Sequence, residues 1–256
     1  MSIIFRILIF WYSLISFFQR KILVKNIDKN DLVLDVGSGD KPFWRADVIV
    51  DKYLEDDQQR HSGAIVYDKR KIFLEGDVEK LPFKDKVFDF VFCSHLLEHV
   101  ESPDKAIAEL TRVAKKGYIE VPFAIIDLLK PFPPHLWFCF YENNTLFFHQ
   151  KEKEKNIFVE ETERFGKIFY DNPLIQFLFS KMYKSIFITI YWKNNLKHSV
   201  KRVKNPYTYS YQEELHKKTL FTKVSFILYK IFYSLITKLF YSKKEIDLKK
   251  LLLKKD

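Results

Sequence analysis

The amino-acid sequence predicts an α/β fold with a mostly parallel sheet, a terminal antiparallel hairpin and a helical C-terminal extension. Three observations point to this fold. Short apolar runs recur between residues 32 and 121, which is typical of strands in a sheet covered on both faces. Two aromatic runs then flank a group of turn residues. From residue 151 onward, long apolar segments carry Lys at helical intervals.

The composition is that of a globular protein. Of the 256 residues, 47% are hydrophobic and 30% are charged, which is unlike a disordered chain. The two cysteines, Cys93 and Cys139, are too few for a disulfide framework and lack the spacing of metal ligands. We therefore expect a reducing, cytoplasmic setting.

The first 24 residues are expected to form an apolar N-terminal helix. Residues 1–19 carry one charge, at Arg6, and are marginal for a bilayer span, which needs ~20 apolar residues. They lack the basic region and the cleavage site of a signal peptide, so no cleavage is expected. Two interpretations stay open: a helix packed on its own domain, and a helix on a membrane surface.

Five parallel strands are expected in the next domain, which we place at residues 25–150. They span Leu32–Val36, Asp47–Asp51, Lys71–Glu75, Phe88–Cys93 and Gly117–Val121, with an amphipathic helix over Pro103–Ala114 before the last one. Only residues 37–46 join the first two strands, fewer than the ~12 that a parallel crossover usually needs. The first helix should therefore be shortened to a turn around Pro42–Trp44.

The two aromatic runs at residues 135–150 predict a hairpin. Glu142, Asn143 and Asn144 lie between the runs, and Asn tolerates the left-handed conformation that a tight turn needs. After five parallel strands, this hairpin would supply the reversed strand pair of the sheet.

The turn after the first strand has the residues of a ligand-binding loop. Asp35 lies near the end of the strand, and Gly37, Ser38 and Gly39 follow, where the missing Cβ atoms of the glycines allow the backbone to approach a ligand. Asp40 comes next, so the loop is not the G-x-G-x-x-G loop that binds a pyrophosphate. The acids at positions 35 and 40 would repel a diphosphate and suit a cationic ligand.

Later strand ends carry further polar residues. Asp51 ends the second strand, where an acid can accept hydrogen bonds from both hydroxyls of a ribose. Asp77 follows the third strand in a G-D-V-E turn, where it can accept a hydrogen bond from an adenine amino group while the Val78 amide donates to a ring nitrogen. Ser94 and His95 follow the fourth strand.

Four features in this order resemble the class I S-adenosylmethionine-dependent methyltransferases, in the type 11-like branch that contains small-molecule and quinone methyltransferases. They are D-V-G-S-G, the acid at 51, G-D-V-E-x-L-P-F and F-D-x-V-x-C-S-H-x-L-E-H-V. The resemblance covers residues 30–122 and implies a Rossmann-like sheet and S-adenosyl-L-methionine (SAM) as cofactor. It implies these cofactor-binding residues: Asp35, Gly37, Ser38, Gly39, Asp51, Lys52, Asp77, Val78 and Ser94.

Further motifs resemble glycan- and cell-envelope-associated members of the family. These motifs are G-S-G-x-x-P, A-D-V…D, E-V-P and H-x-W. They imply methyl transfer to an O, N or C nucleophile of a small-molecule or lipid- or glycan-linked acceptor, with cell-envelope biosynthesis as one hypothesis. The loop lacks the third glycine of the family and the first helix is short. A non-catalytic module that keeps the fold for binding or assembly is therefore the alternative.

His95 is the candidate general base, because it follows the fourth strand where the acceptor approaches. Methyl transfer can also proceed by alignment of the reactants alone, without a base. His95, Glu98 and His99 have the i, i+3, i+4 spacing of metal ligands. We interpret them instead as a helix signature of the family with internal hydrogen bonds, and we expect no metal. His135 and Trp137 flank the same opening, and for Trp137 we favour packing within the hairpin.

The region from 151 to 256 is expected to be a basic, aromatic-rich helical extension. Residues 181–256 hold 18 Lys and Arg residues against five acids, although the whole chain has a net charge of +10. Three interpretations are open: a lid over the acceptor, peripheral contact with an anionic membrane, and nucleic-acid binding. Arg202 is the one Arg in this stretch, and Lys is dispersed among apolar residues. We therefore favour membrane over nucleic acid, which prefers Arg clusters.

Overall fold

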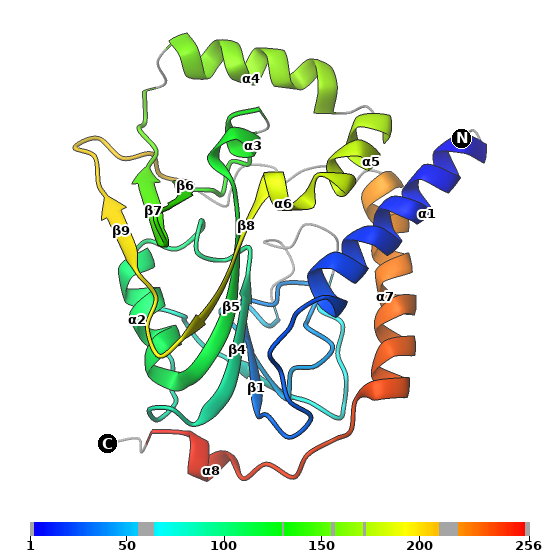
Figure 1. Ribbon diagram of the computed structural model, residues 1–256, viewed down its shortest axis with the longest axis vertical. Coiled ribbons are helices and arrows are strands. Elements are labelled where there is room, and N and C mark those ends of the chain that lie inside the picture. The colour runs from blue at the N-terminus through cyan, green and yellow to red at the C-terminus, as the bar shows by residue number, and fades with distance from the viewer. Residues whose placement is uncertain are drawn as a thin grey trace.

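A computed structural model of the chain describes residues 3–55, 64–129, 131–154, 157–170, 173–209 and 220–253. A six-stranded sheet lies at its centre, in the order β3-β2-β1-β4-β5-β8 (Figure 1). The strands are β1 Val33–Val36, β2 Val48–Asp51, β3 Ile72–Glu75, β4 Phe88–Ser94, β5 Ala114–Pro122 and β8 Phe187–Lys193. The first five are parallel and β8 is antiparallel to β5. The predicted α/β class and the five parallel strands are confirmed.

The chain order of the strands reverses between β1 and β4. From β1 the sheet extends to β2 and β3 on one side and to β4 and β5 on the other. In open parallel sheets, the crevice at the carboxyl ends of strands at such a switch point is where ligands bind. The topology therefore predicts a ligand site among the residues that follow β1, β2, β3 and β4.

The predicted hairpin is present, but it belongs to a second sheet. Strands β6 (Trp137–Glu142) and β7 (Thr145–Gln150) are joined by Asn143 and Asn144, both with positive φ, and β9 (His198–Lys201) pairs with β7. The interpretation of the hairpin as the reversed pair of the main sheet was wrong. The antiparallel edge of that sheet is β8, in a segment that we had expected to be helical.

One face of the main sheet is covered by helix α2 (Pro103–Val113) and the hairpin. The helix begins with Pro at its first position, which is preorganised for a first helical turn. Its buried residues Ala106, Ile107, Leu110 and Val113 recur at helical spacing and join one apolar cluster with strands β6 and β7. The hairpin is thereby held against the carboxyl end of the sheet.

The other face is covered without a crossover helix. As predicted, the link between β1 and β2 is only a turn, and Phe43 from this turn is 1% exposed. Its ring stacks on that of Phe92 in β4, with 4.3 Å between the centroids. Trp44 packs next to it and donates a hydrogen bond from Nε1 to the Lys21 carbonyl, 2.7 Å away. The side chains of Phe43 and Trp44 thus cover the part of this face that a crossover helix usually covers.

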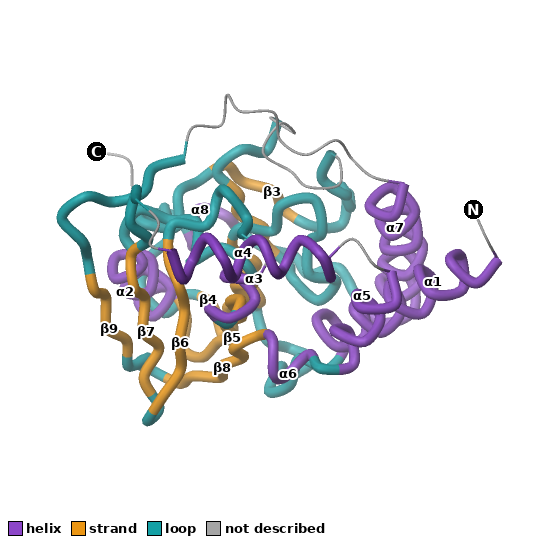
Figure 2. Tube along the Cα trace, turned by 90° about the horizontal axis from the view of Figure 1, so that it is seen from above, coloured by secondary structure: helices purple, strands orange, loops and turns teal. Residues whose placement is uncertain are grey.

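The remaining helices are α1 Ile3–Phe17 with the π-helical turn η1 Phe18–Ile22, α3 Ala124–Leu129, α4 Ile157–Tyr170, α5 Pro173–Lys181, α6 Tyr183–Ile186, α7 Leu220–Phe240 and α8 Leu248–Leu251. Of these, α1, α5 and α7 lie together on one side of the molecule (Figures 1 and 2). Helix α1 packs against both α5 and α7. Among the described residues, no helix combines the length and the apolarity that a membrane crossing requires.

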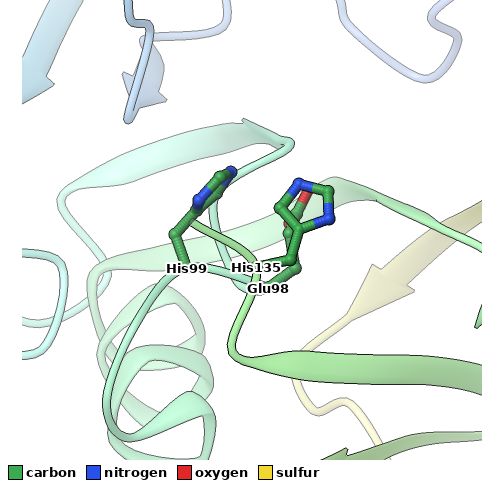
Figure 3. Close-up of side chains that lie close together, drawn as sticks. All are labelled: Glu98, His99 and His135. Atoms are coloured by element: carbon green, nitrogen blue, oxygen red, sulfur yellow. The ribbon is translucent and has the colours of Figure 1, made fainter. Parts of the chain in front are cut away.

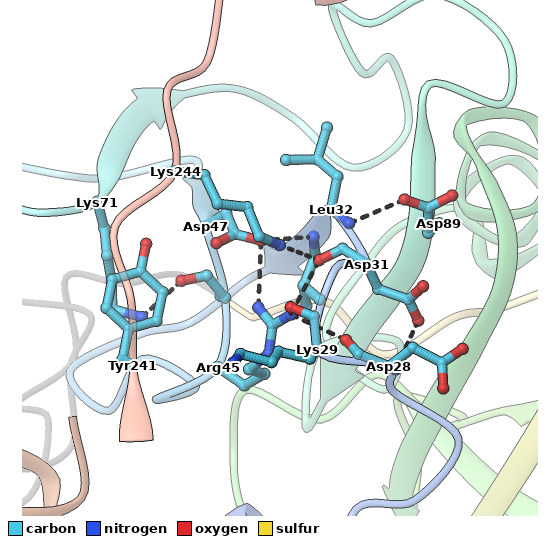
Figure 4. A network of polar contacts seen from close by, with 12 residues as sticks. Asp28, Lys29, Asp31, Leu32, Arg45, Asp47, Lys71, Asp89, Tyr241 and Lys244 are labelled. Atoms are coloured by element: carbon cyan, nitrogen blue, oxygen red, sulfur yellow. Dashed lines mark hydrogen bonds and ion pairs between the residues drawn. The ribbon is translucent and has the colours of Figure 1, made fainter. Parts of the chain in front are cut away.

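The segment after α7 contacts residues at the amino-terminal ends of strands in the main sheet (Figure 4). Lys244 contacts the buried Asp47 at 3.0 Å and donates to the Asp31 carbonyl, while Asp47 also accepts from the Val33 amide at 2.9 Å. Arg45 adds hydrogen bonds to three nearby carbonyls. Residues near both ends of the chain therefore stabilise the start of β1.

Candidate active site

A pocket of about 680 Å³ lies at the carboxyl ends of the parallel strands. Its size is within the usual range of small-molecule sites, ~300–1,000 Å³. Seven of the predicted site residues line it: Gly37, Gly39, Asp51, Lys52, Asp77, Val78 and His95. The predicted site residues at these strand ends therefore line one cavity.

The glycine turn forms one wall of this pocket. Gly37 has φ +69°, and a Cβ there would lie 2.6 Å from the Leu96 side chain. Gly39 has φ +56°, but a Cβ there would have no described neighbour within 4 Å. Both positions need the left-handed conformation that glycine adopts without strain. Gly37 is required for packing, whereas Gly39 leaves open space beside the pocket.

The Asp51 carboxylate is held in place by backbone amides. Its Oδ2 accepts from the Gly39 amide at 2.8 Å and its Oδ1 from the Tyr53 amide at 3.1 Å. Asp51 is 9% exposed and lines the pocket at the end of β2. The hydrogen bond to Gly39 joins the acid and the glycine turn into one unit, so that a ligand contacting either is positioned against both.

Lys52 and Asp77 form an ion pair on the neighbouring wall. Lys52 Nζ lies 2.8 Å from Asp77 Oδ2, and the Glu79 amide donates to Asp77 Oδ1 at 2.9 Å. Burial raises the pKa of Asp77, but the hydrogen bonds from Lys52 and Glu79 outweigh it and the pKa is lowered. Asp77 is thus a charged acceptor at the turn after β3, beside Val78.

Three predicted residues lie outside the wall of this pocket. Asp35 is 1% exposed and accepts a 2.6 Å hydrogen bond from the Phe43 amide, so its carboxyl group supports the short turn from behind. Ser94 donates to Glu120 at 3.0 Å, and Ser38 is half-buried within the glycine turn. Burial raises the pKa of Asp35 to about 6.

His95 lies in the pocket wall between two buried carboxylates. Its Nδ1 is 3.1 Å from Glu98 Oε1, and its Nε2 is 3.0 Å from Glu120 Oε1 but outside hydrogen-bonding geometry. Burial and Arg20 lower the pKa of His95, yet the two carboxylates outweigh them and the pKa is raised. Its φ of +55° is unusual for a non-glycine residue and typical of functional sites. The surroundings thus favour the charged imidazolium.

Glu120, at the end of β5, is a buried acid that the sequence analysis did not select. It is 0% exposed and accepts from Arg20 Nε at 2.8 Å, from the Tyr118 hydroxyl at 2.6 Å and from Tyr183. Burial raises its pKa, but Arg20 and the other donors lower it well below the usual range. This cluster connects the N-terminal segment to the His95 side of the pocket.

The outer wall of the pocket also comes from residues that the sequence did not reveal. Leu136 and Gln150 belong to the hairpin region, and Arg202 and residues 206–209 follow β9. The Arg202 guanidinium lies 5.3 Å from the centre of the Trp137 ring and donates to Asp104 at 2.9 Å. The predicted basic extension therefore contributes part of the site. Trp137 itself is 1% exposed and packs in the core, as favoured from the sequence.

Residues 49–119, from within β2 to within β5, match a family model described as a methyltransferase domain. This chain carries a class I S-adenosylmethionine-dependent methyltransferase domain of the type 11 branch. The resemblance stated from the sequence motifs is confirmed. The cofactor implied by this domain is SAM.

Known relatives of the methyltransferase domain match only parts of the chain. A demethylmenaquinone methyltransferase of a Roseiflexus species is 34% identical over 79 residues, which is 29% of this chain and 32% of that protein. An uncharacterized methyltransferase of Schizosaccharomyces pombe is 32% identical over 111 residues, or 37% of this chain and 40% of that protein. The chain thus spans less than half the length of these relatives.

Two solved structures are also similar to part of this chain. A protein from Pyrococcus horikoshii is 21% identical, with a TM-score of 0.38 over 62% of this chain and 81% of that protein. A possible histamine N-methyltransferase from Thermotoga maritima is 23% identical, with a TM-score of 0.33 over 46% and 54%.

The residues of the methyltransferase domain fit the implied cofactor. Gly39 leaves space where a side chain would project, and Asp51 and Asp77 present carboxylate oxygens from neighbouring strand ends. Carboxylates suit a ligand with hydroxyl and amino donors and a positive charge, and no Lys-rich phosphate loop is present at the glycine turn. This set of hydrogen-bond acceptors suits a nucleoside that carries a sulfonium and an ammonium group.

Proposed function

We propose that the protein transfers a methyl group from SAM to an O, N or C nucleophile of a small-molecule or lipid- or glycan-linked acceptor. The observation that carries the proposal is the meeting of the glycine turn, Asp51 and Asp77 around one pocket at the sheet's switch point. When bound there, SAM supplies an electrophilic methyl group. The protein's own contribution is to orient the reactants in line and to exclude water.

In this proposal each wall of the pocket has a separate role. Asp51 accepts hydrogen bonds from the ribose hydroxyls, Asp77 and the Val78 amide recognise the adenine, and the turn at Gly37 and Gly39 lies against the methionine half. The acceptor enters from the side of Leu136, Gln150 and Arg202, where the wall belongs to the second sheet and to residues 202–209. His95 lies between the two regions.

Calorimetric titration with SAM and S-adenosylhomocysteine tests the cofactor part of the proposal. We expect saturable binding that is abolished in Asp51→Ala and kept in Asp85→Ala, an exposed acid outside the pocket. A folded protein that binds neither compound would contradict the proposal. Tight SAM binding without methyl transfer to any acceptor fraction would favour a non-catalytic binding or assembly module.

We also propose that the enzyme works at the surface of an anionic membrane, on an acceptor presented there. The proposal is supported by the outer face of α7, where Ile227, Ile231, Leu235 and Leu239 recur every four residues and are each about half exposed or more. Lys223, Lys230 and Lys238 of the same helix are also exposed. Apolar side chains at the acyl boundary with Lys reaching the headgroups are typical of interfacial helices.

Helix α1 adds a second apolar stripe next to α7. Ile4, Ile7 and Trp11 are 67%, 51% and 48% exposed, and α1 packs on α7. Exposed apolar residues on two helices that pack together exceed the solitary ones common on protein surfaces, and larger exposed apolar patches are typical of interaction sites. The Lys residues favour a membrane of anionic lipids, because each Lys or Arg near such a surface contributes ~1 kcal/mol.

Co-sedimentation with vesicles tests this part. Vesicles of phosphatidylglycerol and phosphatidylcholine should retain the protein, and salt should weaken the binding. Leu235→Glu should release it, whereas Ile125→Glu, at an exposed aliphatic position on α3, should not. Equal retention of both variants, or no retention of the unaltered chain, would contradict the membrane proposal without affecting the cofactor proposal.

A further inference from the structure

Three potential metal ligands meet beside the pocket, although they come from separate parts of the sequence. Glu98 and His99 follow β4, and His135 lies two residues before β6 of the hairpin. One ligand atom from each residue lies within 4.8 Å of the other two. Figure 3 shows the two imidazole rings next to one another with the Glu98 carboxyl group beside them, and the ring centroids are 4.6 Å apart.

Both imidazoles are oriented as metal-bound histidines usually are. His99 Nδ1 lies 3.2 Å from the Pro134 carbonyl oxygen, and His135 Nδ1 lies 3.0 Å from Asp127 Oδ1. A carbonyl oxygen only accepts hydrogen bonds, so His99 carries its proton on Nδ1 and keeps a lone pair on Nε2. A carboxylate at His135 has the same effect. Hydrogen bonds of this kind fix the tautomer and the ring orientation of metal ligands.

Glu98 supplies a buried negative charge that its protein partners do not fully satisfy. The side chain is 0% exposed, and Oε1 is 3.1 Å from His95 and 3.8 Å from His135 Nε2. Oε2 is buried and has no hydrogen-bond partner among the described residues. An unsatisfied buried carboxylate oxygen is costly, and a bound cation would remove that cost.

We propose that Glu98, His99 and His135 bind one divalent transition-metal ion, zinc in the first instance. Two imidazoles and one carboxylate are the protein ligands in one class of catalytic zinc sites, which keep a further position open. Zinc bonds of ~2.0–2.2 Å require the three ligand atoms to draw closer together than they are here. His99 lines the pocket together with Pro134 and Leu136, so the open position faces the acceptor side.

The structure adds His135 to the residues that sequence spacing had suggested. In the sequence, His95, Glu98 and His99 had the spacing of metal ligands, and internal hydrogen bonding was the preferred interpretation. In the structure His95 contacts Glu98 and Glu120, whereas His135 joins His99. Asp127, which orients His135, is itself held by Lys151 at 2.5 Å.

A consequence for the acceptor rests on the proposed methyltransferase function. A metal held by Glu98, His99 and His135 would lower the pKa of an acceptor hydroxyl group that took the open position, and the proton would pass to solvent. Methyl transfer from SAM would then form the oxygen–carbon bond and break the carbon–sulfur bond, with both electrons remaining on sulfur. Metal binding itself does not depend on this step.

The test is metal titration of the full chain after removal of metal with EDTA. We expect one Zn²⁺ per chain by calorimetry, and one Co²⁺ with visible absorption bands typical of four or five ligands. His99→Asn and His135→Asn should each weaken binding by on the order of 100-fold or more, and Asp127→Asn by about 10- to 100-fold. His149→Asn, in the hairpin but outside the cluster, should bind as the unaltered chain does.

Folding is checked for every variant by circular dichroism and thermal unfolding. A folded chain that binds neither metal, or one that binds equally well in His99→Asn and His135→Asn, would overturn the proposal. SAM titration of the metal-free protein separates this result from the proposed function, because Gly39, Asp51 and Asp77 lie at the ends of other strands. Loss of metal binding with SAM binding kept would leave the methyltransferase proposal intact.

Discussion

Gly37 and Gly39 share a positive φ but have different surroundings, and this difference makes their substitutions separable. Gly37→Ala places a Cβ 2.6 Å from Leu96 in addition to the backbone strain, so we expect a loss of about 2–4 kcal/mol in the free energy of unfolding. Gly39→Ala meets no neighbour and should cost about 1–2 kcal/mol, the strain alone.

For SAM affinity, we expect Gly39→Ala to have the larger effect relative to its loss of stability. The Cβ of Gly39→Ala projects into the space proposed for the cofactor, so this variant should lose SAM affinity by a larger factor than its small loss of stability suggests. Urea denaturation and SAM titration of both variants measure the two effects. A Gly39→Ala protein with unchanged affinity would show that the ligand does not approach this turn.

Asp35 makes the stability of the protein depend on pH in an unusual direction. Burial raises its folded pKa to about 6 from the ordinary 3.8, so between these pH values the folded chain keeps a proton that the unfolded chain has lost. This contribution to stability is therefore complete below about pH 4 and is lost as the pH rises toward 6. Asp35→Asn removes the titration and can still accept the hydrogen bond from Phe43.

We expect Asp35→Asn to be more stable than the unaltered chain, with a gain that grows by about 2 kcal/mol between pH 4.5 and pH 7.5. Part of this gain is offset because the nearby Lys21 loses a negative neighbour. Urea denaturation at the two pH values measures the difference. An equal effect at both pH values would mean that Asp35 is ionised throughout.

Among single residues, those of the site that lie at strand ends could be predicted from the sequence. Gly37, Gly39, Asp51 and Asp77 were predictable because each lies at the end of a strand or within three residues after it, and parallel strand ends meet at one edge of a sheet. The contacts Arg20–Glu120 and His99–His135 join residues far apart in the chain. Such pairs depend on the packing of whole elements, which local patterns do not encode.

Strand β8 joins the C-terminal region of the chain to the main sheet. It pairs with β5 over seven residue pairs, and Ile190 opposite Ile119 is 5% exposed in the main apolar cluster. Both sheets therefore contain residues that follow position 150. The core of the methyltransferase domain and the C-terminal region should unfold together.

Ile190→Ala tests this cooperativity. Removal of a buried aliphatic side chain should cost about 2–5 kcal/mol, and the whole denaturation curve should shift without splitting. Tryptophan fluorescence and far-ultraviolet circular dichroism report on different regions and should give the same midpoint. Two separate transitions, with only one displaced, would show that residues after 150 fold as an independent unit.

The position of β8 was missed although the sequence contains a signal for it. Residues 186–192 read Ile-Phe-Ile-Thr-Ile-Tyr-Trp, which is rich in β-branched and aromatic residues, and alternate side chains in β8 are buried. The run lies within a longer apolar segment where the helical interpretation was preferred. Asn143 and Asn144 were easier, because a tight turn is determined locally, whereas the sheet to which a hairpin pairs is not.

Across the whole molecule, the pocket is enclosed by three regions: the strand ends of the main sheet, the hairpin region, and residues 202–209. A ligand that contacts all three should stabilise the fold as a unit. At 100 times its dissociation constant, SAM would add about 2.7 kcal/mol, or a rise of about 5–10 °C in Tm for a chain of this size.

Thermal unfolding with and without SAM measures this shift. We expect one transition that moves upward as a whole, and no shift in Asp51→Ala because its ribose acceptor is missing. Asp85→Ala should respond as the unaltered chain does. A shift that persists in Asp51→Ala would place the ligand elsewhere in the protein.

The contact between α1 and α7 also has a consequence for the time course of synthesis. Phe17 packs on Tyr229 and Phe232, yet about 200 residues separate these partners. At ~5–20 residues per second, the ribosome needs roughly 10–40 s to deliver α7 after α1 has emerged. Throughout this interval the aromatic side chains of α1 lack their final cover. We therefore expect ribosome-bound chains halted before residue 220 to be recovered with chaperones or membranes, and chains halted after the end of α7 to be recovered with less of both.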